Sequence, residues 1–271
     1  TLAAYREGGM LLGVVIAAIA PALLAGFGAA NLGYPAFGLL LGAIAITTAI
    51  LTLPIWRRTP IVGEGLSFSG LASSGAFKLL LLAVANSLPV ALTSTLFLFF
   101  VEDRLELSGK AGGFLVLFFL CAGLSVPLWA RLSQSLGSKT ILMIAMPLAI
   151  ASFVGAGLLA PGHAVGFAVV CIASGAALGA DMVVLPAMFS VALTKAGLKA
   201  SAAFGIWSFA GKLGLALAAF TVLPWLERSG FVPGQDNSPE ALSTLTLAYV
   251  ILPCTLKLFA FGLVLTLPTE K

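Results

Sequence analysis

The chain has 271 residues, of which 60% are hydrophobic and 9% are charged, and its formal net charge is +4. Soluble domains carry about 25% charged residues, so this composition excludes an ordinary soluble domain and predicts a protein embedded in lipid. The excess of basic residues then indicates basic loops on one membrane face, and we expect no nucleic-acid partner.

Apolar runs that are long enough to cross a ~30 Å hydrocarbon core as helices recur along the whole chain. They predict eight spans: Met10–Phe27, Tyr34–Trp56, Leu79–Phe100, Gly112–Trp129, Thr140–Leu159, Val165–Leu193, Ala202–Leu223 and Thr244–Leu267. The alternating segments of ~10 residues that a membrane β-barrel requires do not occur. We therefore predict an all-α polytopic membrane protein.

The basic residues predict the orientation of these helices. If Thr1 is cytoplasmic, the inner segments hold most of them, namely Arg6, Arg57, Arg58, Lys78, Arg131, Lys139, Lys195, Lys199 and Lys271. The outer segments hold only Arg104, Lys110 and Arg228. We expect both termini to be cytoplasmic, in a bacterial inner membrane.

The spans divide unequally around the segment Arg57–Lys78, which is rich in Gly and Ser and is typical of a linker. We expect residues 1–56 to be the last two helices of an N-terminal bundle, residues 57–78 a cytoplasmic linker, and residues 79–271 a six-helix bundle. Two spans before the linker and six after it are what a 6+6 repeat protein would show without its first four helices. The chain also begins with Thr, so we expect a fragment.

Several residues inside or between the runs carry local expectations. Gly175 and Gly179 form a GxxxG face that allows two helices to approach closely. His163 follows Ala160-Pro161-Gly162 and is expected in a loop, and the polar segment Glu227–Leu242 is expected to be an ordered turn or short hinge. The three cysteines, Cys121, Cys171 and Cys254, lie in apolar runs, which predicts neither a disulfide nor a metal site.

Two charges lie inside consecutive runs, Asp181 in one and Lys212 in the next. In antiparallel helices they would lie at similar depths, roughly 18 Å and 15 Å from the same membrane face. A charge at mid-membrane costs ~2.5 kcal/mol or more, so it faces a partner or a watered cavity. Asp181 and Lys212 therefore form either a structural ion pair or part of a substrate or ion pathway.

For each of the other polar residues in the spans, two or more roles are possible. Lys257 is a neutral hydrogen-bonding lysine, an attractor for an anionic solute, or a side chain that extends to the inner face. Trp207 stacks on a solute or anchors the helix at the interface, while Ser208 shares the helix face of Lys212. Asn86 faces a cavity or hydrogen-bonds a neighbouring helix, as do Ser87, Thr93 and Ser94.

Enzyme signatures do not occur in the chain: we find no HExxH, P-loop, GxSxG elbow or paired carboxylates. A serine protease dyad of Ser73 or Ser74 with His163 is excluded because the predicted topology places them on opposite membrane faces. Glu102, Asp103 and Glu106 are expected in a solvated outer loop. We therefore predict that the protein is not an enzyme.

Four passages resemble the major facilitator superfamily, and within it the glycoside-pentoside-hexuronide:cation symporters, which are melibiose-carrier-like proteins. AYREGGMLLGVVIAAIAPALL is similar to the family's entry into helix five, NSLPVALTSTLFLFFVEDRLELSG to helix seven and the loop after it, and PLWARLSQSLGSKT to helix eight and its basic loop. The sharpest likeness is GADMVVLPAMFSVALTKAGLKASAAFGIWSFAGKLGLALAAF, at Gly179–Phe220, which resembles helices ten and eleven.

The resemblance implies alternating-access transport by two bundles that rock about a central site, and it covers helices five to twelve of the family. Lys212 matches the family's helix-eleven lysine, which lies near the cation and sugar site. The family's cation-binding carboxylates belong to earlier helices. A departure lies at Phe189–Lys199, which has no Asp, Glu or Tyr where the family has an acidic, tyrosine-containing segment.

Together these features predict a secondary transporter for a sugar-like or small organic solute. We expect H⁺ or Na⁺ as the coupling ion, no other cofactor, and a monomer in the full-length carrier. The predicted pathway residues are Lys212, Asp181, Trp207, Ser208 and Asn86. The alternatives are a non-transporting membrane component or a lipid-moving carrier, with Asp181 and Lys212 as a structural ion pair.

Overall fold

The computed structural model describes residues 33–56, 75–195 and 200–267, together with Gly9, Gly13, Ile16, Ala17 and Ala20. Within these ranges all regular structure is helical, as the sequence predicts. The predicted span Met10–Phe27 and nearly all of the linker lie outside the described ranges.

Seven helices in the described ranges are long and apolar enough to cross a membrane. They correspond to the predicted spans from Tyr34 onward. Their segments are α2 (Gly33–Trp56), α4 (Ala76–Phe99) with the π-turn η2 (Phe100–Arg104), α5 (Ala111–Leu136), α6 (Ser138–Gly157), α7 (Ala164–Lys195), α8 (Ala200–Arg228), and α9 (Pro239–Thr246) continued by the π-turn η3 (Leu247–Ile251) and α10 (Leu252–Leu265).

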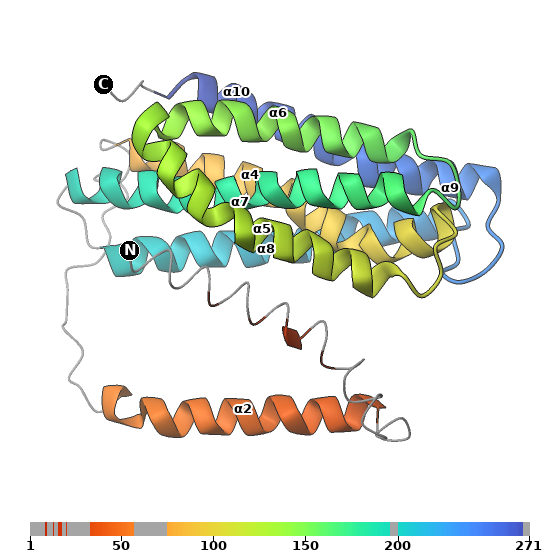
Figure 1. Cartoon of the computed structure of the whole chain (residues 1–271), viewed down its shortest axis with the longest axis horizontal. Coiled ribbons are helices and arrows are strands. Elements are labelled where there is room, and N and C mark those ends of the chain that lie inside the picture. Colours follow the sequence, from red (N-terminus) through yellow and green to blue (C-terminus); the bar gives the residue numbers. More distant parts are fainter. Residues whose placement is uncertain are drawn as a thin grey trace.

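The helices from α4 to α10 pack side by side in one bundle, and α2 lies apart from it (Figure 1). The closest packing joins α5 to α7, α6 to α7, α4 to α8, and α10 to both α4 and α6. The core is almost wholly apolar, while the central stretch of α2 buries none of its side chains within the described part of the chain.

Helices α5 and α7 touch backbone to backbone because two glycines of α7 face α5. A Cβ atom at Gly175 would overlap the carbonyl oxygen of Phe118, and one at Gly179 would overlap Ser125 and the carbonyl oxygen of Ala122. The predicted GxxxG contact is therefore confirmed. The indole nitrogen of Trp129 also donates to the carbonyl oxygen of Ala176 at 2.7 Å, which fixes the register of the two helices.

The last span changes its helical phase in the middle. Pro253 has no N–H group to donate to the preceding turn, and the π-turn Leu247–Ile251 lies immediately before it. One extra residue in a turn rotates every following side chain by about 100° around the helix axis. The inward direction of side chains in α10 therefore depends on this π-turn.

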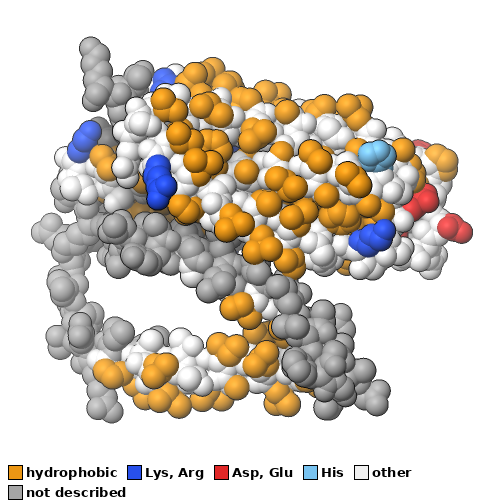
Figure 2. Space-filling model, viewed as in Figure 1, with side chains coloured by type: hydrophobic (Ala, Val, Ile, Leu, Met, Phe, Trp, Pro, Cys, Tyr) orange, Lys and Arg blue, Asp and Glu red, His pale blue; other side chains and the backbone are white. Residues whose placement is uncertain are grey.

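Both ends of the bundle are held by polar contacts. At the end that the sequence predicts to be cytoplasmic, Lys139 Nζ donates to the carbonyl oxygens of Leu265 at 3.0 Å and Leu267 at 2.6 Å, which caps α10. At the opposite end, where acidic side chains gather (Figure 2), the Oδ1 atom of Asn237 accepts from the Val232 N–H and Ser238 caps α9. The segment Glu227–Leu242 is thus an ordered turn, as predicted.

Candidate functional site

A cavity of about 380 Å³ lies between α4, α7 and α8. Its lining is mostly apolar, with a few polar side chains on one wall. This combination is typical of small-molecule sites, in which a few placed polar groups fix orientation. The lining residues are Ala83, Asn86, Ser87, Val90, Ala91, Ser94, Leu178, Asp181, Met182, Leu185, Pro186, Trp207, Gly211 and Leu215.

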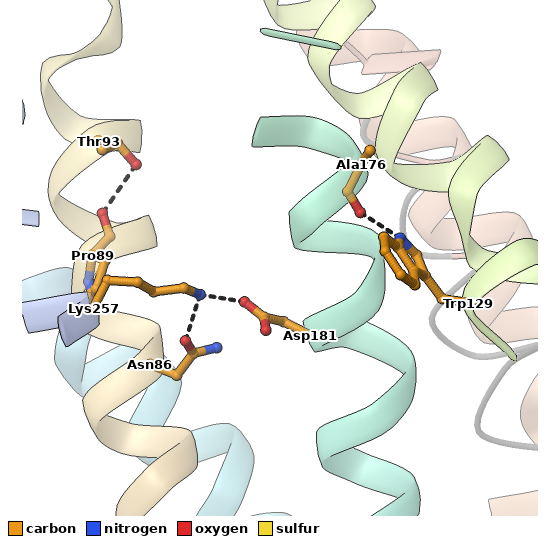
Figure 3. Close-up of polar contacts among 7 residues, drawn as sticks. All are labelled: Asn86, Pro89, Thr93, Trp129, Ala176, Asp181 and Lys257. Carbon is orange, nitrogen blue, oxygen red and sulfur yellow. Dashed lines mark hydrogen bonds and ion pairs between the residues drawn. The ribbon is translucent and has the colours of Figure 1, made fainter. Parts of the chain in front are cut away.

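The polar centre of this wall is a buried cluster from three helices (Figure 3). The Nζ atom of Lys257, on α10, donates to Oδ2 of Asp181, on α7, at 2.5 Å. It also donates to Oδ1 of Asn86, on α4, at 2.6 Å. All three side chains are nine-tenths buried or more, with exposed fractions of 4%, 6% and 5% for Lys257, Asp181 and Asn86.

The second carboxylate oxygen of Asp181 has no hydrogen-bond donor. Oδ1 is buried, and none of the described residues donates to it. A buried acceptor without a donor costs about 1–3 kcal/mol, and more when it is charged. Asp181 therefore combines one satisfied oxygen with one that can still accept a hydrogen bond or a proton.

Lys212 and Ser208 lie elsewhere on α8. Both side chains are exposed, and neither lines the cavity, although Gly211 does. Lys212 makes no ion pair or hydrogen bond with any described residue. The Asp181–Lys212 pair weighed above is therefore not formed here, and Lys257 takes the place of Lys212 as the partner of Asp181.

The structure also corrects two readings of Lys257. Its ammonium group does not extend to the inner face, because it is buried and bonded to Asp181 and Asn86. It also supplies no excess positive charge for an anionic solute, because the carboxylate of Asp181 neutralises it. The predicted pathway residues include Lys212 but not Lys257, although Lys257 also lies well inside a predicted span, as Asp181 does.

Trp207 reaches the cavity from the α8 side. Its ring packs on Phe189 with ring centroids 4.8 Å apart and on Phe204 at 6.1 Å, and the side chain is half-buried. The ring thus lines the cavity while it is held by other aromatic rings. Ser87 and Ser94 share the cavity wall with Asn86, whereas Thr93 is turned away and donates to the carbonyl oxygen of Pro89 at 3.0 Å.

Glu102 and Asp103 lie on the π-turn η2 and not in the predicted loop, at the end of the bundle opposite Lys139. No group of three potential metal ligands is found in the described ranges. These acidic side chains line a separate surface hollow of about 680 Å³. Asp103 is already engaged there, because its Oδ1 accepts from the N–H of Gly234 at 2.8 Å. Arg104 donates to Thr246 Oγ1 at 3.1 Å, so these two side chains of η2 hold it to α9 and to the turn before α9.

The model of a family described as "MFS/sugar transport protein" matches residues 1–271. A search of curated protein sequences finds no match to the chain.

Proposed function

Because the chain belongs to the MFS/sugar transport protein family, and is thus a membrane transporter of a small solute, we propose that it is a secondary active carrier for a sugar-like or small organic solute. In this proposal two helix bundles rock about a central site and expose it to each membrane face in turn. The proposed orientation places both termini in the cytoplasm of a bacterial inner membrane, and the proposed functional unit is a monomer.

The observation that carries the proposal is the 380 Å³ cavity with its polar wall. A cavity of this size suits a small molecule, and its groups match a partly polar solute. Asn86, Ser87 and Ser94 provide hydrogen-bonding groups, and Trp207 provides an aromatic surface of the kind on which a sugar ring packs.

The exposure of Lys212 supports a pathway along α8. A charge on a lipid-facing surface at mid-membrane would cost about 2.5 kcal/mol or more, so the exposed face of α8 is better explained if it borders water or a polar partner. We propose that Lys212 and Ser208 lie on the solute pathway there, with Lys212 contacting the solute or a carboxylate of the opposite bundle.

The finer features of the carrier are further proposals. The four passages quoted above support membership of the melibiose-carrier-like symporters, with these helices corresponding to helices five to twelve of that family. Symport with H⁺ or Na⁺ would supply the driving force. The non-transporting alternative makes no use of a cavity of this size.

Uptake by cells that express the carrier tests the proposal. We use radiolabelled melibiose, xylose and glucuronate as probes, one for each solute class named in the resembling family. At least one probe is expected to accumulate, and Lys212→Ala is expected to abolish its accumulation without reducing the amount of carrier inserted in the membrane.

The matched control is Lys110→Ala, which removes an exposed lysine side chain just before α5 that bonds to no described residue. This variant is expected to transport normally. The proposal is wrong if no probe accumulates, and the role of Lys212 is wrong if Lys212→Ala accumulates the probe as well as Lys110→Ala does.

A further inference from the structure

We propose that Asp181 and Lys257 form the proton-binding site of this carrier, in which Oδ1 of Asp181 takes up the proton while Lys257 holds Oδ2. The inference rests on the proposed function, because a bound proton drives transport only in a protein that moves a solute. It adds the coupling ion, the atom that receives it and the contacts that it changes.

Position is the first argument. Among the ten acidic residues of the chain, Asp181 is the one that lies in the middle of a predicted span. It lines the large cavity on one side and a small cavity of about 20 Å³ on the other. Ionisable residues inside membrane helices are costly and are a common component of proton pathways. The carboxylate is thus buried but borders the space that water and solute would enter.

The two carboxylate oxygens of Asp181 differ in their hydrogen bonding. Oδ2 is occupied by the ammonium group of Lys257, and Oδ1 has no donor among the described residues. A proton can bind Oδ1 without displacing any hydrogen bond in the cluster. The free position at Oδ1 is therefore better suited to a proton than to any larger ion.

The number of oxygen ligands excludes Na⁺ from the same place. Hard cations require several oxygen ligands, and the lining of the small cavity is mainly carbon. A proton needs only the one free oxygen, Oδ1. Within the described part of the chain, the site favours H⁺ over Na⁺.

No competing acid or base faces this carboxylate from the helices around it. On α10, Lys257 bonds to the carboxylate, while the Cys254 thiol donates to the carbonyl oxygen of Ile150 at 3.7 Å. Neither Cys254 nor Cys121 of α5 lines either cavity. α4 contributes the neutral amide of Asn86. The charged Lys212 of α8 lines neither cavity. Among the residues that line the two cavities, only Asp181 and Lys257 are ionisable.

Protonation of Asp181 changes the charge of the Asp181–Lys257 pair. A hydronium ion from the cavity gives its proton to Oδ1, which leaves one water and converts the carboxylate to a carboxylic acid. Lys257 keeps its three protons, so the net charge of the pair changes from zero to +1. The attraction between α10 and α7 then weakens, while Lys257 keeps its bond to Asn86 on α4. Proton binding therefore loosens one wall of the cavity from another.

Infrared difference spectroscopy of the whole protein in lipid tests this step without any solute. The chain has three aspartates, Asp103, Asp181 and Asp236; Asp103 lies on the π-turn η2 and Asp236 in the turn before α9, both at the end of the bundle opposite Lys139. In protein labelled with ¹³C-carboxyl aspartate, acidification is expected to produce a label-shifted carbonyl band of an acid shielded from water. The band is expected to persist in Asp103→Asn and to vanish in Asp181→Asn.

Asp181→Glu covers the case in which Asp181→Asn does not fold. In aspartate-labelled protein this variant is expected to keep the band of the shielded acid but to lose its label shift. Absence of the band from the wild type, or its persistence with label in Asp181→Asn or Asp181→Glu, overturns the proposal.

Uptake into vesicles separates this proposal from the proposed function. With the accumulating probe from the uptake test, Asp181→Asn is expected to lose accumulation driven by a pH gradient, in vesicles that hold the same amount of inserted carrier as wild-type vesicles. Gradient-driven accumulation in Asp181→Asn overturns the proton site but leaves the carrier function intact. No uptake by the wild type, despite an infrared band from Asp181, overturns the carrier function.

Discussion

Lys257 and Lys212 each lie well inside a membrane-spanning helix, but the structure gives them opposite surroundings. Lys257 is enclosed by α4, α7 and α10 and is bonded to Asp181 and Asn86. Lys212 lies on the exposed face of α8 and bonds to no described residue. One lysine is thus part of the interior of the bundle, while the other is available to whatever faces α8. The difference separates a charge that is paired inside the bundle from a charge that, in the proposed function, borders the solute pathway.

The largest expected effect comes from removing the enclosed lysine. Lys257→Met leaves a buried carboxylate without its partner and is expected to lower the free energy of unfolding by about 3–5 kcal/mol. Lys212→Met is expected to leave the free energy of unfolding unchanged, because no described contact is lost. Reversible unfolding in lipid–detergent micelles measures this free energy for both variants. Equal losses of stability in the two variants would contradict the difference between the two lysines.

A double variant sharpens the comparison by removing both charges of the enclosed pair. Asp181→Leu with Lys257→Met is expected to recover most of the stability that Lys257→Met loses, because apolar groups can replace a buried ion pair at little cost. A deficit of about 1–3 kcal/mol is expected to remain, since Asn86 Oδ1 loses its donor. The same unfolding measurement applies. A double variant that is less stable than Lys257→Met would show that the two charges do not act as a pair.

The smallest effect is expected at the end of the bundle that the sequence predicts to be cytoplasmic, where a lysine also has partners but is near solvent. Lys139→Met removes the bonds to the carbonyl oxygens of Leu265 and Leu267 and is expected to cost about 0.3–1 kcal/mol. Lys110→Met, which removes no described contact, is the control and is expected to cost nothing. Added salt should reduce the difference in free energy of unfolding between these two variants. A difference that does not change with salt would contradict an electrostatic role for Lys139.

The membrane helices and one helix contact could be predicted from the sequence. The spans from Tyr34 onward follow from hydropathy because backbone polar groups in lipid must be bonded within helices. The contact at Gly175 and Gly179 follows from the spacing of two residues without side chains. In both cases the information is local in the chain.

The partner of Asp181 could not be chosen from the sequence. Counting residues along a helix gives the depth of a side chain, and Lys212 and Lys257 lie at similar depths to Asp181. The direction of each side chain around its helix axis also matters, and for Lys257 this direction depends on the π-turn Leu247–Ile251 before it. Which helices are neighbours is a further property of packing. Asn86 was predicted as a cavity or helix-contact residue, and the structure gives it both positions.

The contact between α5 and α7 also determines where the acid of this cluster lies. Gly175 and Gly179 precede Asp181 on the same helix, and any side chain at either position would push α7 away from α5. Such a shift would carry the carboxylate with it and change its separation from the ammonium group across the cavity wall. The distance between Asp181 and Lys257 therefore depends in part on the opposite side of α7, where the two glycine positions leave no room for a side chain.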